Sequence, residues 1–501
     1  MKNKSNDYVI RILDSPLAVN AGDWNALLAA QSPAGILNPF MRHEYLAALH
    51  ASGSATPKTG WTPRFVTLWL GDTLAGACAL YLKAHSYGEY VFDWAWANAY
   101  AQNGLDYYPK ALVAVPFTPV PGARLLARNA DERALLVKAL VAWCDEEKLS
   151  SLHLLFASDE DVAACQEAGL MLRHTVQFHW TNSAPTLVAS RTALPPGGAA
   201  APVARQSRFH GPGLQGVAAS TLVAAHSALS PEPDLLLPSL GEVRDGDIFE
   251  PEPGFSGRPF ASFDDFLMTL SQEKRKKIRQ ERRKVRDAGI TFRWSLGQDI
   301  SSADWDFFYR CYERTYLEHG NAPYLSRDFF HRMESSMPEN WLLFIAEHEG
   351  KPIASSLIAV SARPDCGNGI FHDENTPETP ENAGNPPFQG LTAYGRYWGA
   401  LARVDCLHFE ACYYQPIEWC IAHGFQSFEG GAQGEHKMAR ALLPVKTTSA
   451  HWLAHPSFAD AVERFLEREG AGIDQYMEDL ERRSPFKAPA LPNPTDLTIP
   501  S

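Results

Sequence analysis

The sequence has few cysteines and no surplus of positive charge. Eight cysteines are spread over 501 residues without a CxxC pair, so a disulfide framework is excluded and the spacing predicts reduced thiols of a cytosolic protein. Lysine and arginine number 45 against 58 aspartates and glutamates, which leaves a formal net charge of −13. A protein whose whole surface is basic and coats nucleic acid is therefore excluded.

Long hydrophobic runs are also lacking. The longest runs, Leu74–Leu82 and Ala111–Phe117, are far shorter than the roughly 20 residues that cross a bilayer. The first residues, Met1–Tyr8, lead into an alternating stretch without the apolar region of a signal peptide. We therefore expect a soluble, cytoplasmic protein with no integral membrane segment. With 45% hydrophobic residues, the chain can still bury a large core.

Tryptophan is absent from the middle of the chain. The sequence has 13 tryptophans but none between Trp180 and Trp294. Most of this gap, residues 184–258, is rich in proline, glycine, alanine and serine, which predicts a flexible insertion. The predicted organisation is then a first domain at 1–183, the insertion, a basic connecting helix at 259–290, a second domain at 291–488 with a loop insertion at 363–390, and a tail at 489–501.

The two predicted domains repeat one order of elements. Each begins with a β-hairpin, over residues 65–81 and 341–360, and each ends with a strand that closes on His-Trp. Between these lie strands at 111–116, 152–156, 407–411 and 427–429, and helices at 132–147, 161–168 and 415–423. Alternating strands and helices with a period near two hundred residues predict an α/β (α+β) fold that arose by duplication of a domain.

Several long motifs occur in one order along the chain. They are Val115–Gly122 with Arg124, Gln177–Trp180, Phe263–Leu267 with the basic run after it, Tyr394–Gly399, Leu407–Gln415, Glu429–Lys437, and Ser449–Trp452 with Pro485–Lys487. In these motifs the chain resembles the FemAB-like predicted N-acyltransferases, which are described as peptidoglycan biosynthesis/recognition proteins of the GNAT superfamily. The resemblance implies tandem, duplicated GNAT-like acyl-CoA N-acyltransferase domains.

The resemblance also implies the substrates. An acyl or aminoacyl group would pass from acyl-CoA or aminoacyl-tRNA to an amine, for instance on a peptidoglycan precursor, and no tightly bound cofactor is expected. GNAT enzymes usually hold the coenzyme A pyrophosphate on a Gln/Arg-x-x-Gly-x-Gly/Ala loop. The glycine-rich stretch Gly430–Gly434 has a different spacing, so another anion site, or a donor other than acyl-CoA, stays open.

The stretch Glu429–Lys437 concentrates two carboxylates, an imidazole and an ammonium around three glycines. Amide formation from an amine needs a base for the ammonium proton and donors for the developing oxyanion. The predicted acid/base groups are Glu429, Glu435 and His436. The predicted binding groups are Gly430, Gly431, Gln433, Gly434, Lys437 and Arg440. A polar turn at a strand end is the alternative interpretation.

His408 and Glu410 flank Phe409 in a predicted strand, which would place both on one face as further acid/base candidates. Tyr414 and Gln415 would line the same pocket. A buried hydrogen bond between His408 and Glu410 that supports the core is the alternative. Together with His436 they are also conceivable metal ligands, but their spacing matches no common motif, so no metal is predicted.

Arg396 lies between the aromatic residues Tyr394 and Trp398. Its guanidinium is suited to a bidentate contact with phosphate or carboxylate, and a cation–π contact within a hairpin is the equal alternative. In the first half, Gln177 and His179 are candidates to face the space between the domains. Packing between the domains is the other interpretation of these two residues.

The predicted connecting helix reverses the overall charge. Residues 272–287 hold nine basic and three acidic side chains, a local +6 that leaves −19 for the rest of the chain. Arg275, Arg279 and Arg282 follow helical spacing and form one stripe. The stripe predicts binding of an anion, and a solvated helix face is the alternative. The resemblance to the FemAB-like family implies that this anion is a phosphate-bearing donor, either transfer RNA or a nucleotide-linked carrier.

Taken together, these patterns predict an N-acyltransferase whose site lies in the second domain and whose acceptor is an amine-bearing small molecule or peptidoglycan precursor. A non-catalytic module on the same scaffold, which recognises a cell-wall precursor or RNA, is the second hypothesis.

Overall fold

Two series of strands follow one another along the chain. The computed structural model describes residues 8–32, 35–183, 257–362, 390–432 and 434–487. The strands of the first series are β1 (Tyr8–Leu13), β2 (Trp61–Pro63), β3 (Phe65–Leu70), β4 (Thr73–Cys78), β5 (Leu80–Lys83), β6 (Lys110–Val113), β7 (Leu126–Ala127), β8 (Ser151–Ala157) and β9 (Met171–Thr181). Those of the second series are β10 (Ile290–Leu296), β11 (Trp341–His348), β12 (Lys351–Val360), β13 (Thr392–Ala400), β14 (Ser427–Ala432) and β15 (Leu443–Leu453).

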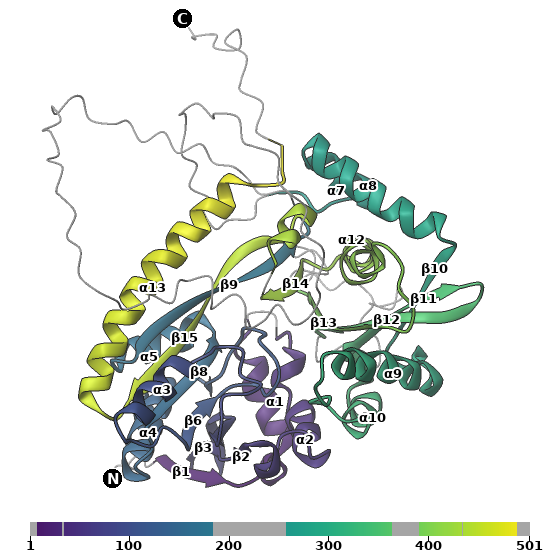
Figure 1. Cartoon of the computed structure of the whole chain (residues 1–501). Coiled ribbons are helices and arrows are strands. Elements are labelled where there is room, and N and C mark those ends of the chain that lie inside the picture. Colours follow the sequence, from purple (N-terminus) through teal and green to yellow (C-terminus); the bar gives the residue numbers. More distant parts are fainter. Residues whose placement is uncertain (1–7, 33–34, 184–256, 363–389, 433, 488–501) are drawn as a thin grey trace, which may run out of the picture.

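Eleven of these strands, drawn from both series, form one sheet (Figure 1). Their order is β10-β11-β12-β13-β14-β9-β15-β8-β6-β5-β2, and β1-β3-β4-β7 form a smaller sheet. The last strand of the first series, β9, pairs with β14 of the second, while β15 pairs with β8. β9 and β15 also pair with each other, antiparallel, from His179 opposite Leu443 to Met171 opposite His451. Each half therefore places its final strand beside a strand of the other half.

The strand order is symmetric about this central pair. On one side β8 runs parallel to β6, and on the other β14 runs parallel to β13. Each parallel pair is short: residues 111–113 face 152–154, and residues 392–394 face 427–429. Beyond Tyr394 and Glu429 the two strands continue without pairing to each other. The predicted α/β fold and its duplication are confirmed.

The helices cover the sheets. They are α1 (Ala21–Ala29), α2 (His43–Ala51), α3 (Trp94–Gln102), α4 (Ala130–Glu146), α5 (Asp159–Glu167), α7 (Phe263–Thr269), α8 (Gln272–Asp287), α9 (Ser302–Glu318), α10 (Arg327–Ser336), α11 (Leu407–Phe409), α12 (Gln415–Ala422) and α13 (Pro456–Arg482). The longest, α13, packs across β9 and β15, where Arg173 and Glu469 form two hydrogen bonds of 2.8 Å. No described helix is both long and apolar enough to cross a membrane.

The largest hydrophobic core belongs to both halves. It joins α1 and α2 of the first half to α9 and α10 of the second. The hydroxyl of Tyr45 lies 3.3 Å from that of Tyr397, and Phe40 meets Tyr394 edge to face with 5.4 Å between the ring centroids. All four side chains are buried, so this core holds β13 against the helices of the first half.

Most predicted elements occur where their patterns place them. The hairpins are β3–β4 and β11–β12, the helices at 132–147 and 161–168 are α4 and α5, and the basic helix is α8. The predicted tail, nearly all of the predicted insertion and all but the last residue of the predicted loop 363–390 lie outside the described residues.

The prediction of a strand over residues 407–411 is wrong. This segment begins a helix that continues from α11 through the π-helical turn Glu410–Tyr414 into α12. Pro416, which lies in the first turn of α12 and lacks an N–H, has the pattern of a helix start, but the helix extends through it behind the wider π turn. Since residues two apart in a helix point in different directions, His408 and Glu410 do not share a face.

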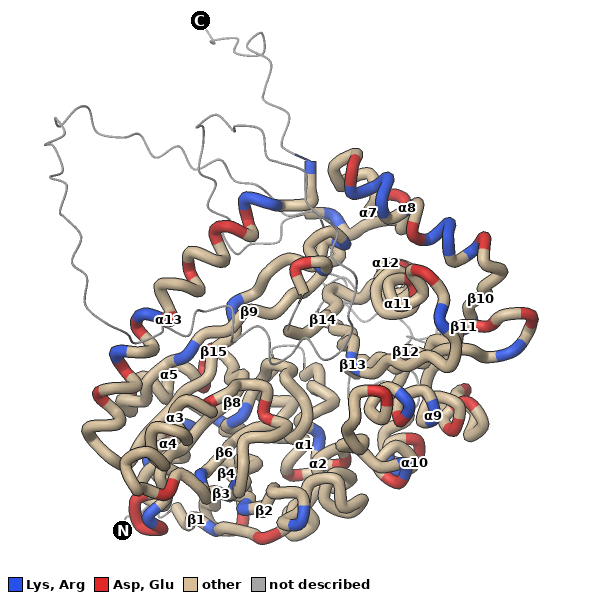
Figure 2. Tube along the Cα trace, in the orientation of Figure 1, with Lys and Arg blue, Asp and Glu red and all other residues tan. Residues whose placement is uncertain are grey.

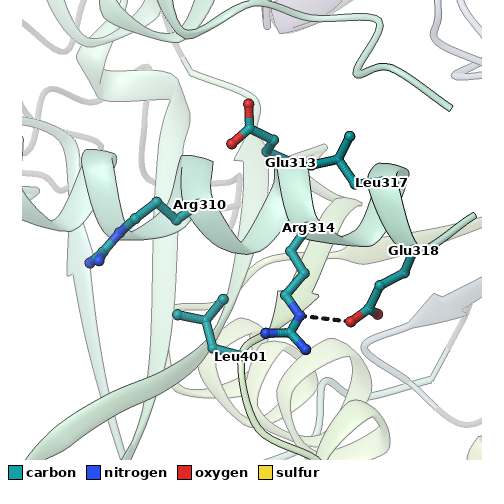
Figure 3. A pocket seen from close by; sticks show the side chains of 6 residues that line it. All are labelled: Arg310, Glu313, Arg314, Leu317, Glu318 and Leu401. Atoms are coloured by element: carbon teal, nitrogen blue, oxygen red, sulfur yellow. Dashed lines mark hydrogen bonds and ion pairs between the residues drawn. The ribbon is translucent and has the colours of Figure 1, made fainter. Parts of the chain in front are cut away.

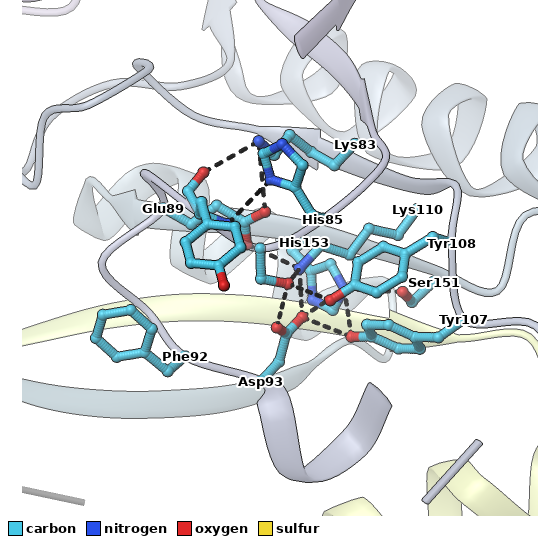
Figure 4. Close-up of polar contacts among 12 residues, drawn as sticks. Lys83, His85, Glu89, Phe92, Asp93, Tyr107, Tyr108, Lys110, Ser151 and His153 are labelled. Atoms are coloured by element: carbon cyan, nitrogen blue, oxygen red, sulfur yellow. Dashed lines mark hydrogen bonds and ion pairs between the residues drawn. The ribbon is translucent and has the colours of Figure 1, made fainter. Parts of the chain in front are cut away.

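A buried cluster of charged side chains connects the central strand pair to the first half (Figure 4). The ammonium of Lys110 donates to the carboxylates of Glu89, at 2.7 Å, and Asp93. Nε2 of His153 lies 3.9 Å from Asp93, and its Nδ1 lies 2.7 Å from Nδ1 of His451 on β15. Burial acts to raise the pKa of Asp93, but the Lys110 ammonium outweighs it and holds that pKa below its usual range.

Replacing Lys110 by methionine leaves Glu89 and Asp93 buried without their ammonium. We expect the free energy of unfolding to fall by about 3–5 kcal/mol, the cost of breaking a buried pair, as measured in denaturant titrations. The control, Lys446→Met, removes an exposed pair with Asp474 whose side chains are 41% and 59% exposed, and should cost about 0–1 kcal/mol. Equal losses in the two variants would contradict the role of the cluster.

Candidate active site

The predicted site residues of the second half gather where β13 and β14 stop pairing. Tyr394 and Glu429 are the last facing pair. After Glu429, the register of β14 against β9 shifts, so that Gly430 and Gly431 form a bulge. A Cβ at Gly430 would lie 2.3 Å from Cδ2 of Leu442, and Gly431 has φ +74°. Gly431 therefore needs glycine for its backbone conformation, and Gly430 leaves room for the side chain of Leu442 and for the carbonyl oxygen of Phe178, 3.0 Å from such a Cβ.

Glu429 carries an isolated carboxyl group. Its Oε2 is buried and has no hydrogen-bond partner among the residues that the structure describes. Burial raises the pKa of Glu429 to about 8, although the charges of Arg396 and Arg124 oppose the rise. Opposite Glu429 on β9 lies His179, whose pKa burial and the charge of Lys437 lower to about 4. At neutral pH this site therefore combines a neutral imidazole with a carboxyl group that is mostly protonated and ionises as the pH rises through about 8.

Arg396 reaches the same place from β13 and contacts the first half. Its Nη2 donates to the carbonyl oxygen of Phe117 at 3.3 Å. Its Nε is buried and, within the described part of the chain, without a partner. Its Nη1 lies 3.9 Å from the position of a Cβ on Gly431. The guanidinium therefore borders the bulge and keeps one buried donor unused.

Lys437 stabilises the bulge. Its ammonium donates to the carbonyl oxygens of Gly430, Gly431 and Ala432 at 2.7, 3.2 and 2.9 Å. Burial, followed by the charge of Arg396, lowers the pKa of Lys437 to about 7. All three N–H groups are engaged, so binding of a substrate by this ammonium would require it to leave these carbonyls.

A second group of predicted site residues forms a polar layer beneath α8. Arg440 donates to both carboxylate oxygens of Glu281 at 2.9 Å. Tyr414 donates to the same carboxylate. Glu410 accepts from Arg282 at 3.1 Å and from Gln415 at 2.8 Å. These charges are therefore compensated inside the protein.

A third group lies at the surface end of the same region. The exposed ring of His408 is 5.5 Å from that of Trp398. Nε2 of His436 lies 3.3 Å from the hydroxyl of Tyr413. Glu435 forms an exposed ion pair of 2.7 Å with Arg483, just after α13. Gln433 lies outside the described residues. Among the described residues, the other predicted acid/base groups therefore contact residues other than Glu429.

The first half supplies Arg124, which the sequence did not identify as part of the site, and the predicted candidate Gln177. Arg124 is fully buried and donates to the carbonyl oxygens of Leu155 and Gly122 at 2.9 and 3.2 Å, and its charge acts on Glu429. Gln177 donates to the carbonyl oxygen of Pro119 at 2.7 Å. The proline-rich motif around these contacts was the available signal, since the carbonyl groups of such a segment need hydrogen-bond donors when they are buried.

The basic helix α8 lies at the periphery of the molecule (Figures 1 and 2). Its buried face includes Ile278, Glu281 and Val285. Arg282 turns inward to Glu410 and Glu418, so it does not belong to a free stripe. The exposed basic side chains of α8 are Lys276, Lys277, Arg279, Arg283, Lys284 and Arg286.

An open depression of about 500 Å³ lies elsewhere, along α9 (Figure 3). Arg310, Arg314 and Leu401 line it, and Arg314 forms a 2.6 Å ion pair with Glu318. None of the predicted site residues contributes to it. In the part of the chain that is described, no group of three or more His, Cys, Asp and Glu side chains is placed to hold a metal ion.

Comparisons with known proteins give one family match and several distant structural similarities. No curated protein matches the chain in sequence. The crystal structure of FemX shares 9% identity over 89% of this chain and 98% of its own, with a TM-score of 0.42. A tandem GNAT protein from the clavulanic acid biosynthesis pathway shares 10% over 90% and 99%, with a TM-score of 0.37. L-PGS from Bacillus licheniformis shares 9% over 86% and 97%, with a TM-score of 0.39.

The family match is extensive. It covers residues 16–186, 253–364 and 388–488, which include both halves of the sheet and α8. The chain therefore belongs to the FemAB-like family, described as peptidoglycan biosynthesis/recognition.

Proposed function

We propose that this protein is an N-acyltransferase that moves an acyl or aminoacyl group from an activated donor to an amine, with Glu429 as the general base. The observation that carries the proposal is the carboxyl group of Glu429, whose Oε2 is buried without a hydrogen-bond partner among the described residues and whose pKa is raised to about 8. An amine reaches the site as an ammonium ion and must lose a proton before it attacks. A carboxylate with a pKa near 8 accepts that proton more readily than an ordinary one.

The reaction needs one displacement. The free amine attacks the carbonyl carbon of the thioester or ester, the C–N bond forms, and the thiolate or alkoxide leaves as the C–S or C–O bond breaks. Before the attack, Glu429 takes one proton from the ammonium group and later returns it to solvent. The second proton, which the nitrogen loses as the amide forms, neutralises the leaving thiolate or alkoxide. Burial raises the pKa of the nearby Cys412 to about 12, so a thiolate nucleophile is disfavoured and direct attack is the simpler path.

The donor and the acceptor follow from different features. Both acyl-CoA and aminoacyl-tRNA carry phosphates, and the exposed basic residues of α8 favour such a donor. The family description, peptidoglycan biosynthesis/recognition, supports a peptidoglycan precursor as the acceptor. The cytoplasm, where such donors occur, is the expected location.

Glu429→Gln removes the proposed base and keeps the shape of the side chain. We expect kcat/KM to fall by about 10²–10⁴-fold, and the rise of the rate with pH through about 8 to disappear. The measurement is a pH–rate profile of transfer from acyl-CoA and from aminoacyl-tRNA to a peptidoglycan precursor. Glu435→Gln tests the other predicted carboxylate, and loss of the pH dependence there, but not in Glu429→Gln, would reassign the base. Binding of the precursor without transfer from either donor would favour the non-catalytic hypothesis.

The same substitution has a consequence for stability. The unfolded carboxyl group titrates near 4.5, whereas the folded one titrates near 8, so the native state binds the extra proton between these values. The free energy of unfolding therefore falls as the pH rises through this window, and the contribution of this protonated group is lost above it. Glu429→Gln has no carboxyl group to ionise. The melting temperature of the variant minus that of the parent should therefore increase by about 2–4 °C or more between pH 5 and pH 8.5. A difference that does not change with pH would contradict the raised pKa.

The basic face of α8 is tested by salt dependence. Changing Lys276, Arg279 and Arg283 together to glutamine removes three exposed charges and should flatten the slope of log affinity for transfer RNA against log salt by about 2. The control triple, Arg314, Arg332 and Lys351 to glutamine, removes the same charge from exposed positions in α9, α10 and β12. An unchanged slope in the first triple, or an equal change in both, would contradict a donor site on α8.

A further inference from the structure

Two oppositely charged groups at the candidate site are each left incomplete. Oε2 of Glu429 and Nε of Arg396 are buried, and neither finds a hydrogen-bond partner in the described part of the chain. Buried polar atoms are nearly always satisfied in a folded protein. A carboxylate oxygen needs a donor and a guanidinium nitrogen needs an acceptor, so a single molecule that offers both would satisfy the two atoms.

The two groups are close enough for one small ligand. Glu429 faces Tyr394 in the last pair between β14 and β13, strands that lie roughly 5 Å apart where they pair, and Arg396 follows Tyr394 by two residues on the same strand. The charge of Arg396 acts on Glu429, yet Glu429 keeps its unpaired oxygen. A positive and a negative group of the ligand must therefore be separated by only a few bonds.

The surroundings of Arg396 are aromatic and come from both halves. Phe117 of the first half stacks on Tyr324 of the second, with 4.9 Å between ring centroids and an interplanar angle of 12°. Burial raises the pKa of Tyr90 and of Tyr316, and the charge of Arg396 opposes both shifts, so both hydroxyl groups lie within its field. Phe117 and Tyr90 have φ of +59° and +64°, a strained conformation for bulky residues that persists mainly at functional positions.

The other cations nearby are occupied. Lys437 donates to three carbonyl groups, and Arg124 donates to backbone carbonyl oxygens. Of these three cations, Arg396 is the one that keeps a buried donor without a partner among the described residues, and its single charge matches a carboxylate better than a phosphate with up to two charges.

We propose that the acceptor is an α-amino acid group, in which the amine to be acylated and a carboxylate are bonded to the same carbon. Arg396 binds the carboxylate, and the ammonium group donates to Glu429. This inference rests on the proposed function, because it takes Glu429 as the group that receives the amine.

The test compares two amines that differ by one carboxylate. L-lysine carries the α-amino acid group, and cadaverine is the same chain without it. Isothermal titration of the parent protein should give an affinity for L-lysine about tenfold or more above that for cadaverine, the ratio expected for one charge-assisted hydrogen bond. In Arg396→Gln the ratio should approach one. Arg396→Lys, which keeps the charge but loses the planar fork, should give an intermediate ratio, and the surface variant Arg314→Gln should keep the parent ratio.

The outcomes separate this inference from the proposed function. Equal binding of the two amines by the parent protein, binding of neither, or a ratio that survives in Arg396→Gln would overturn the α-amino acid site, while acyl transfer to either amine would still support the transferase. A tenfold preference for L-lysine that depends on Arg396, without acyl transfer from any donor, would support the α-amino acid site and contradict the proposed transferase activity. Thermal melts of each variant show whether a lost ratio reflects lost folding.

Discussion

The pairing of β9 with β15 is the constraint on which the rest of the structure depends. Because each half places its final strand beside a strand of the other half, the C-terminal ends of β8 and β14 both reach the central pair. β8 ends at Ala157, opposite Thr448 of β15, and Thr448 pairs with His174 of β9. β14 ends at Ala432, opposite Gln177 of β9. The two strand ends therefore reach positions three residues apart along β9. The loop that follows β6 can then supply the carbonyl groups of Phe117 and Pro119 to Arg396 and Gln177. The candidate site is thus a product of both halves, and neither half could form it alone.

Within this frame, the treatment of buried carboxylates distinguishes structural from functional groups. Asp93 is held by Lys110, Glu281 by Arg440 and Glu410 by Arg282. In each case a cation within hydrogen-bond distance offsets the cost of burial. The Oε2 atom of Glu429 is buried without such a contact in the described part of the chain, and burial raises the pKa of this carboxyl group. Glu89 and Asp161 also keep one buried oxygen without a hydrogen-bond partner, but Lys110 and Arg133 pair with their carboxylates at 2.7 and 3.2 Å. Glu429 has no ion pair among the described residues, which is why it is the best candidate for chemistry.

Local patterns in the sequence were sufficient for the hairpins, for α4, α5 and α8 and for β14, since alternation and helical spacing depend on near neighbours. The motifs were sufficient for the family, which the family match confirms. Pairing between distant segments was not accessible: both final strands end on His-Trp, yet nothing in that motif says that β9 lies beside β14. The same limit applies to charges. Glu410 seemed available in the sequence, but its partner Arg282 is 128 residues away, and the mistaken strand over 407–411 hid the helix that brings them together.

The polar layer beneath α8 connects the two surfaces that an acyl transfer requires. The exposed side of α8 is basic, and its buried side binds Arg440 through Glu281. Arg440 in turn donates to the carbonyl oxygen of His436 at 2.7 Å, in the same short helix as Lys437, whose ammonium fastens the bulge after Glu429. Each of these contacts involves a charged group in a largely buried setting, where such hydrogen bonds are strong and directional. These four residues therefore connect Glu429, the proposed base, to α8. The inner charged residues of α8 hold the candidate site in place, and its exposed basic residues are those proposed to bind a phosphate-bearing donor.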